Sequence, residues 1–273
     1  MIVGIIAAGV VVLSLTIFAA LKIKRNVRRK RLMEAPLPQG WEEIIEQNVK
    51  LYNHLPDELK KQLHGLVNVF AAEKNFEGCA GLEITDEIKV TIAAQACVLL
   101  LNRKAGCFDK LDTILVYPHT YVAKKFSSGG VIEIQGRSVR LGESWQNGPV
   151  VLAWDSVVGG AVNITDGKNV VLHEFSHQLD QADGVADGAP ILASRSCYAT
   201  WARVLGDEYK NLRDRAKRFR KSVMHRYGAT NPPEFFAVAT ETFFEKPRQM
   251  KKKHSELYDA LSDYYKMDPA AWD

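Results

Sequence analysis

Apolar residues are grouped along this chain in three ways, and each grouping predicts a different kind of element. Residues 2–21 form an uncharged apolar run, broken only by a serine and a threonine. Residues 41–101 show helical spacing, with Pro56 between early helices and Thr85 as the cap of a long apolar helix. Strands are predicted at 114–122, 131–141 and 150–154. Helices dominate again from Val170, so the pattern predicts an α+β fold with a helical N-terminal lobe.

The run at 2–21 predicts a transmembrane anchor, because twenty helical residues extend about 30 Å, the thickness of a bilayer's hydrocarbon core. A cleaved signal peptide would carry basic residues before the apolar run and a small-residue cleavage site after it, and this sequence has neither. Basic residues follow the run instead: Lys22, Lys24, Arg25, Arg28, Arg29, Lys30 and Arg31. The positive-inside rule then predicts a single-pass protein of the bacterial cytoplasmic (inner) membrane, with the rest of the chain facing the cytoplasm.

The same basic cluster accounts for the positive net charge of +4. Without its seven residues, the chain holds 29 Lys and Arg against 32 Asp and Glu. We therefore expect contact with anionic lipid headgroups and no direct nucleic acid binding. A second basic stretch, 210–226, predicts a solvated helix, with a docking surface as the alternative.

Three segments are predicted: the anchor at 2–21, a basic juxtamembrane segment and linker at 22–40, and one domain at 41–273. The four cysteines show no C-x-x-C pairing, so in a cytoplasmic domain we expect them to be reduced and mostly buried.

The sequence His173-Glu174-Phe175-Ser176-His177 is the strongest indication of chemistry in the chain. On a helix, His173 and His177 lie one turn apart on one face, so both imidazoles can bind one metal ion. Glu174 lies between them, within reach of a water on that metal. Asp180 falls on the same face, where a carboxylate could accept the second N–H of a metal-bound histidine. A helix with two surface histidines and a solvated acidic end is the alternative.

A third ligand is expected from the segment that begins Asn231-Pro232-Pro233, a typical helix start. Glu234 and Glu241 lie seven residues apart on one face of this helix, so spacing alone cannot choose between them. Tyr227 precedes the helix, and its phenol is a candidate hydrogen-bond donor to an oxyanion, with simple packing as the alternative.

Several further motifs accompany these residues: 76–82, 84–87, 91–97, 142–145 and 148–155. Together with residues 173–180, and with Tyr227 followed after six residues by Glu-Phe-Phe-Ala, they make the chain resemble the Mlc titration factor A family. Its members are bacterial zinc-dependent peptidases with a catalytic domain similar to that of anthrax lethal factor. The resemblance runs from about Trp41 to the C-terminus and implies a zincin-like metallopeptidase domain. It also implies Glu234 as third ligand and Tyr227 as oxyanion donor.

We therefore expect a membrane-anchored zinc peptidase that acts on peptide or protein substrates, with Zn²⁺ held by His173, His177 and Glu234 and with Glu174 as general base. In this architecture the strand at 150–154 is expected to form the cleft edge and pair with an extended substrate. Two alternatives remain: a protein that sequesters an Mlc-like transcriptional repressor, with weak or latent peptidase activity, and an anchored scaffold whose metal is structural.

Overall fold

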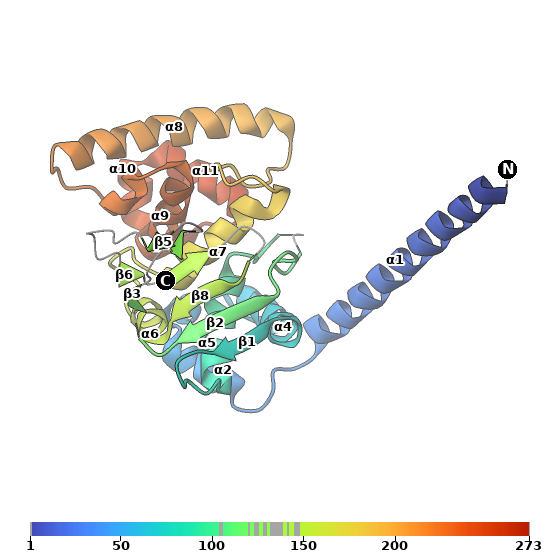
Figure 1. Cartoon of the computed structure of the whole chain (residues 1–273). Helices are drawn as coiled ribbons and strands as arrows, with labels where there is room; N and C mark the ends of the chain where they lie inside the picture. The colour runs from blue at the N-terminus through green and yellow to red at the C-terminus, as the bar shows by residue number, and fades with distance from the viewer. Residues whose placement is uncertain are drawn as a thin grey trace.

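The computed structural model arranges the chain as a mixed sheet with helices packed on it, a second group of helices above that sheet, and one long helix that extends away from both (Figure 1). It describes the backbone of residues 2–103, 106–119, 121–122, 126–127, 130–131, 139–140, 142–144 and 148–272. Side chains are described outside residues 1–13, 15, 104–105, 120–147 and 273. Within this range, one continuous hydrophobic core runs from Ile45 to Met267, so the sheet and both helical groups share it. The α+β prediction is confirmed.

The main sheet has the strand order β1-β2-β8-β7. β1 (Asn75–Gly78), β2 (Thr113–Tyr117) and β8 (Val150–Ala153) are parallel, and β7 (Gly142–Ser144) is antiparallel to β8. Two short antiparallel pairs accompany it: β3 (Tyr121–Val122) with β6 (Val139–Arg140), and β4 (Phe126–Ser127) with β5 (Gly130–Val131). The predicted strand at 114–122 includes residue 120, and the predicted strand at 131–141 includes residues 132–138 and 141, all of which lie outside the described residues.

The prediction that residues 150–154 form the edge of a cleft is wrong. β8 pairs with β2 on one side and β7 on the other, and all four of its residues are buried. Trp154 already belongs to α6 (Trp154–Val162). A strand buried on both faces is a continuous apolar run, as Val150–Ala153 is, and such a run belongs in the interior of a sheet. The edge strand beside β8 is β7, which packs against α7 (Val170–Asp180).

The N-terminal lobe is helical, as expected. It contains α2 (Trp41–Asn48), α3 (Lys50–Asn53), α4 (Asp57–Glu73) and α5 (Asp86–Val98). Thr85 caps α5 by accepting a hydrogen bond from the backbone N–H of Ile88 at 3.3 Å. The exception is β1, a strand within a segment that was expected to be mainly helical. It lies at an edge of the sheet, and its four residues are too few to give a clear periodic pattern in the sequence.

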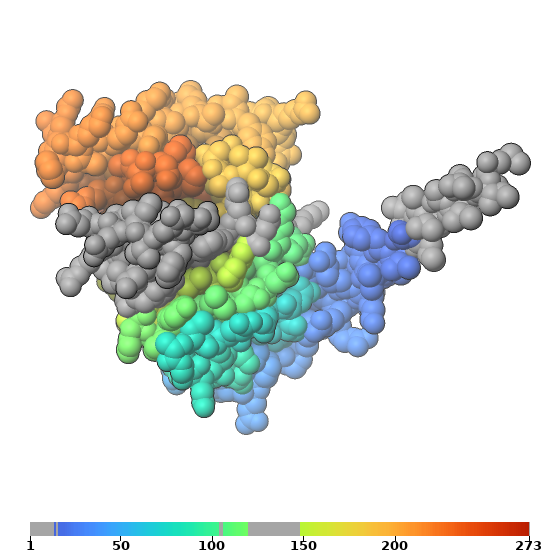
Figure 2. Space-filling model, viewed as in Figure 1, coloured from blue at the N-terminus to red at the C-terminus, as the bar shows by residue number. Residues whose placement is uncertain are grey.

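The first helix, α1 (Ile2–Glu34), extends away from the body of the protein (Figure 1). The part of this helix that is coloured blue in Figure 2 projects from the body in the same direction. Most of the side chains of the predicted anchor, those of 2–13 and 15, lie outside the described residues. Among the residues covered by the description, no helix is both long and apolar enough to cross a membrane.

The C-terminal end of α1 is fixed to α4. Arg29 donates two hydrogen bonds to Glu73 and a third to Asp109, and it is largely buried by them. Arg28 donates to the carbonyl of Ala72, and Arg25 lies 3.7 Å from Asp109. Three residues of the basic cluster, Arg25, Arg28 and Arg29, therefore contact the protein itself.

The second helical group follows the sheet. It consists of α7 (Val170–Asp180), η1 (Gln181–Asp183), α8 (Arg195–Lys217), η2 (Arg226–Ala229), α9 (Pro232–Glu245), α10 (Pro247–Lys253), α11 (Ser255–Tyr265) and η3 (Pro269–Ala271). α8 lies across the top of this group, over α9, in Figure 1. The second basic stretch was predicted as one helix, but α8 ends at Lys217 and residues 218–225 are not helical. Phe219 adopts a left-handed backbone conformation there, with φ 51°, which stops the helix.

All four cysteines are free thiols; Cys97 and Cys107 are buried, Cys79 is half-buried and Cys197 is exposed.

Candidate metal centre

α7 places its two histidines on one face. Asn169 caps the helix, since its side-chain oxygen accepts a hydrogen bond from the N–H of Leu172 at 3.0 Å. Apolar residues of α7, including Leu172 and Phe175, are buried in the core and fix the rotation of the helix. The rings of His173 and His177 consequently stand side by side, with centroids 5.0 Å apart.

α9 brings a carboxylate to these histidines. Asn231 caps this helix by accepting from the N–H of Glu234 at 2.9 Å, and Pro232 opens its first turn. Every residue from Phe235 to Glu245 is buried, so α9 is an inner helix, and it packs against α7. Glu234 therefore lies in the first turn, where the helix dipole favours a negative charge.

Three potential ligand atoms meet at one point. Oε2 of Glu234 lies 2.9 Å from Nε2 of His173 and 3.6 Å from Nε2 of His177. All three ligand atoms lie within 4.8 Å of one another. Two imidazole nitrogens and one carboxylate oxygen are a donor set that suits Zn²⁺, and three protein ligands leave a position open. The residues present therefore fit a catalytic zinc ion.

A second carboxylate contacts the other side of His173. Oε1 of Glu241 lies 3.4 Å from Nδ1 of His173 and also accepts a hydrogen bond from the N–H of Asn169 at 3.1 Å. Asn169 in turn donates to the side chain of Gln95 and the carbonyl of Gly160. Helical spacing could not decide which of Glu234 and Glu241 is the third ligand. In the structure the two carboxylates contact different nitrogens of the His173 ring: Glu234 contacts Nε2 and Glu241 contacts Nδ1.

The electrostatics of the site favour a positive charge on His173. Burial lowers the pKa of His173, but the carboxylates of Glu241, Glu234 and Glu174 outweigh burial and hold this pKa well above its usual range. Burial also acts to raise the pKa of Glu234, yet its contacts with His173 and His177 bring it far below the ordinary value. A metal cation would take the place of the proton that these groups share.

Asp180 does not bond to either histidine in this structure; its Oδ2 accepts from the backbone N–H of Gly188 at 3.0 Å. Gly188 has a φ of +81°, and a Cβ there would lie 2.7 Å from the carbonyl oxygen of Pro232. Asp180 therefore holds the loop after α7 against the first turn of α9, next to Glu234. Burial raises the pKa of Asp180 to about 6.

Tyr227, on η2, lies at the open side of the centre. Its hydroxyl donates to Oε1 of Glu234 at 3.4 Å, its ring lies 5.8 Å from that of His173, and 49% of its surface is exposed. Glu174 is buried, at 5% exposure, within the same group of charges. The structure thus brings together His173, Glu174, His177, Tyr227 and Glu234.

Two residues of the site were not singled out by the sequence. Neither Asn169 nor Glu245 was predicted to belong to it. Oε2 of Glu245 accepts from the N–H of Lys168 at 2.9 Å, and burial beside Glu241 raises its pKa to about 8. The only signal for Glu245 was its position four residues after Glu241 on an apolar helix.

The fold and this donor set define a candidate metal centre of the two-histidine, one-carboxylate class. The family model for the glucose-regulated metallo-peptidase M90 matches residues 24–266. The chain therefore belongs to this metallopeptidase family.

Curated relatives agree with that assignment. The chain is 40% identical over 245 residues to an uncharacterized protein of Synechocystis sp., with 89% of each chain covered. It is 29% identical over 235 residues to Mlc titration factor A of Serratia proteamaculans, covering 85% of this chain and 88% of that one. It is 28% identical over 251 residues to Mlc titration factor A of Yersinia pestis, covering 89% and 91%. The predicted membership of the Mlc titration factor A family is confirmed.

Proposed function

We propose that this protein is a zinc-dependent peptidase with a zincin-like domain over residues 41–273, in which His173, His177 and Glu234 hold the metal. The observation that carries the proposal is the convergence of the three ligand atoms within 4.8 Å, beside the buried carboxylate of Glu174. A peptidase of this class requires a general base next to its ligands, and Glu174 follows the first ligand directly in the sequence.

When bound, zinc supplies Lewis acidity, which polarises the scissile carbonyl and lowers the pKa of water. Glu174 takes the proton of the attacking water and later delivers it to the leaving amine. Tyr227 turns its hydroxyl from Glu234 to the developing oxyanion and donates a hydrogen bond to it. Glu241 orients His173 through Nδ1, and this contact holds Nε2 towards the ligand position.

Among the described residues, no strand pairs with the outer side of β7. β7 is one of the two edge strands of the sheet, is antiparallel to β8 and packs against α7. We infer that substrate adds to β7 as a further strand, in place of the edge first expected at 150–154.

The test is cleavage of a mixed peptide library by the full chain in detergent, read by mass spectrometry. Glu174→Gln keeps the shape and the ligands but removes the base, so we expect zinc content to stay the same and cleavage to fall by about a thousandfold or more. Glu43→Gln makes the same change at an exposed position and should cleave normally. Cleavage that survives in Glu174→Gln would refute this mechanism.

We propose further that α1 anchors the protein in the bacterial cytoplasmic membrane, with the catalytic domain in the cytoplasm. Apolar side chains in its described part are exposed, among them Phe18, Leu21 and Ile23 at 61–67%. Basic residues follow the apolar run, which supports this orientation and contact with anionic headgroups. Carbonate extraction of bacterial membranes should leave the full chain in the pellet, and recovery in the supernatant would contradict an integral anchor.

A second candidate function is sequestration of a transcriptional regulator, because two relatives carry the name Mlc titration factor A. A purified Mlc-like repressor should then bind Glu174→Gln as well as it binds the unaltered chain. Binding by both proteins, without peptide cleavage by either, would favour this function over the peptidase.

A further inference from the structure

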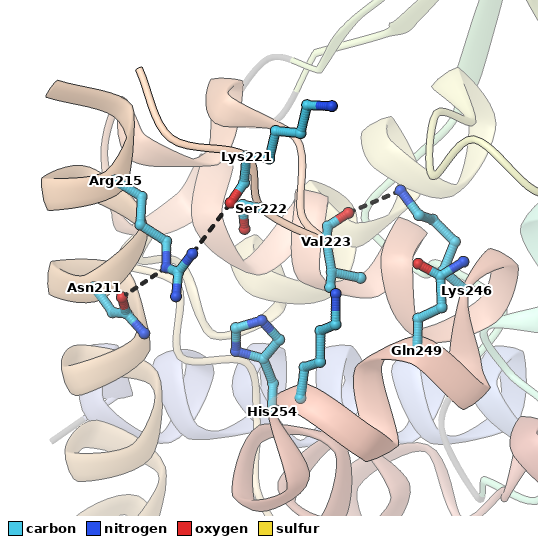
Figure 3. A pocket seen from close by; sticks show the side chains of 9 residues that line it. Asn211, Arg215, Lys221, Ser222, Val223, Lys246, Gln249 and His254 are labelled. Atoms are coloured by element: carbon cyan, nitrogen blue, oxygen red, sulfur yellow. Dashed lines mark hydrogen bonds between the residues drawn. The ribbon is translucent and has the colours of Figure 1, made fainter. Parts of the chain in front are cut away.

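A basic cavity lies between the end of α8, residues 221–223 and α10, and it shares no residue with the candidate metal centre (Figure 3). Its volume is about 440 Å³, which is within the range of small-molecule sites. Arg215, Lys221, Lys246 and Lys253 contribute four cations to its lining. Asn211, Ser222, Gln249 and His254 add further polar groups, and none of the described residues that line it is acidic.

Some of these cations are held in place by the protein. Arg215 donates from Nε to the side chain of Asn211 at 3.2 Å and from Nη1 to the carbonyl of Lys221 at 3.1 Å. Lys246 donates to the carbonyls of Val223 and Asp166. Carbonyl oxygens orient these groups without neutralising them, so the positive charge remains available to a ligand.

Other donors at the cavity have no partner within the described part of the chain. The ammonium groups of Lys221 and Lys253 make no hydrogen bond or ion pair there, and both side chains are exposed. The carboxylate bound to a lining residue is that of Glu208, which lies 2.9 Å from Nδ1 of His254. One carboxylate beside four cations leaves a net positive cavity.

A smaller hollow of about 250 Å³ adjoins the first and extends its positive charge. The two share Arg215, Ser222, Val223 and Lys246. The second adds Arg220 and Arg226, whose two positive charges outnumber the one carboxylate in its lining, that of Asp166. Arg226 is the first residue of η2, the short helix that carries Tyr227. A ligand in these hollows would therefore link the end of α8 and α10 to the segment next to the metal centre.

We propose that this cavity binds a small phosphate monoester. Four cations with several neutral donors match the charge and the acceptor oxygens of a phosphate group, and the enclosed volume fits a metabolite. An acidic peptide is the competing occupant, but a peptide would require an extended groove. The proposal does not depend on the peptidase activity.

The test uses the full chain in detergent, titrated with glycerol 3-phosphate by calorimetry at constant ionic strength, with glycerol as the uncharged probe. The double variant Lys221→Gln and Lys253→Gln removes the two unpartnered ammonium groups. The control Lys217→Gln and Lys252→Gln removes the same charge from exposed positions outside the cavity. None of these four lysines makes a contact that the described fold needs.

We expect saturable binding of glycerol 3-phosphate and none of glycerol. Because each lost contact is a charge-assisted hydrogen bond, binding should weaken at least about tenfold in the cavity variant and less than about twofold in the control. Absence of saturable binding, or equal weakening in both variants, would overturn the proposal. Tighter, cavity-dependent binding of a hexaglutamate peptide would overturn it in favour of an acidic segment.

Discussion

Nδ1 of His173 lies 3.4 Å from Oε1 of Glu241, while Nε2 of the same ring lies 2.9 Å from Oε2 of Glu234. One imidazole is thus held between two carboxylates that come from a single helix, one from its first turn and one from its third. The two glutamates therefore differ in role. Glu234 contacts the nitrogens of both histidines at the proposed metal position, and Glu241 contacts the opposite nitrogen of His173.

Replacing Glu241 with Gln should weaken zinc binding. Glutamine keeps an oxygen for the N–H of Asn169 but removes the charge that supports His173, so we expect a loss of affinity of about 10- to 100-fold. Competition with a chromophoric chelator measures this affinity. Glu256→Gln, at an exposed ion pair with Arg203, is the matched control and should bind zinc normally. If Glu241→Gln bound zinc as tightly as the unaltered chain, Glu241 would not support the metal.

Zinc binding should release protons and strengthen as the pH rises. The carboxylates around His173 hold its pKa well above the usual value, so the metal-free ring is protonated at neutral pH and must lose about one proton to bind a metal. The pKa of Glu234 is lowered, so Glu234 is already ionised. Calorimetry in two buffers with different ionisation enthalpies measures the released protons. Identical apparent enthalpies in the two buffers would contradict this.

Replacing Tyr227 with Phe should reduce turnover and leave zinc content unchanged. The hydroxyl is outside the proposed ligand set, and the loss of one oxyanion donor typically costs about 10²- to 10³-fold in kcat. Tyr227 is half exposed, so thermal stability should change little. Tyr198→Phe removes a hydroxyl that accepts a hydrogen bond from the N–H of Leu192, outside the centre, and serves as control. A fall in zinc content in Tyr227→Phe would instead indicate a role in binding the metal.

Replacing Glu245 with Gln should stabilise the protein at alkaline pH. Burial raises the pKa of this carboxyl to about 8, so the folded state binds a proton that the unfolded state releases near pH 4.5. Stability of the unaltered chain should therefore fall as the pH rises from about 4.5 to 8, at a rate of about 1.4 kcal/mol per pH unit for this group.

Glutamine carries no charge and retains an acceptor for the N–H of Lys168, so the variant lacks this decline. Melting temperatures at pH 5 and pH 8 measure the effect, with a gain expected at pH 8 and almost none at pH 5. Glu43→Gln, at an exposed position, should show no such difference. A gain that is equal at both pH values would contradict the titration of Glu245.

The sequence by itself determined the features that depend on local spacing. Histidines four residues apart on a helix must share a face, so the pairing of His173 with His177 required no tertiary information. Caps at Thr85 and Asn231 could be recognised because a short polar side chain at a helix start bonds to the adjacent backbone. The strand at Val150 followed from its apolar run, although its place in the interior of the sheet did not.

Only the tertiary structure decided how distant segments meet. Glu234 and Glu241 are equivalent in helical spacing, and the packing of α9 on α7 assigns them to different atoms of His173. Tertiary contacts also decided the partner of Asp180, which accepts a hydrogen bond from Gly188. They decided the place of β8 as well, which lies inside the sheet because β2 and β7 pair with its two sides. Such contacts join residues many positions apart, and their formation depends on the burial of the whole core, which no local pattern encodes.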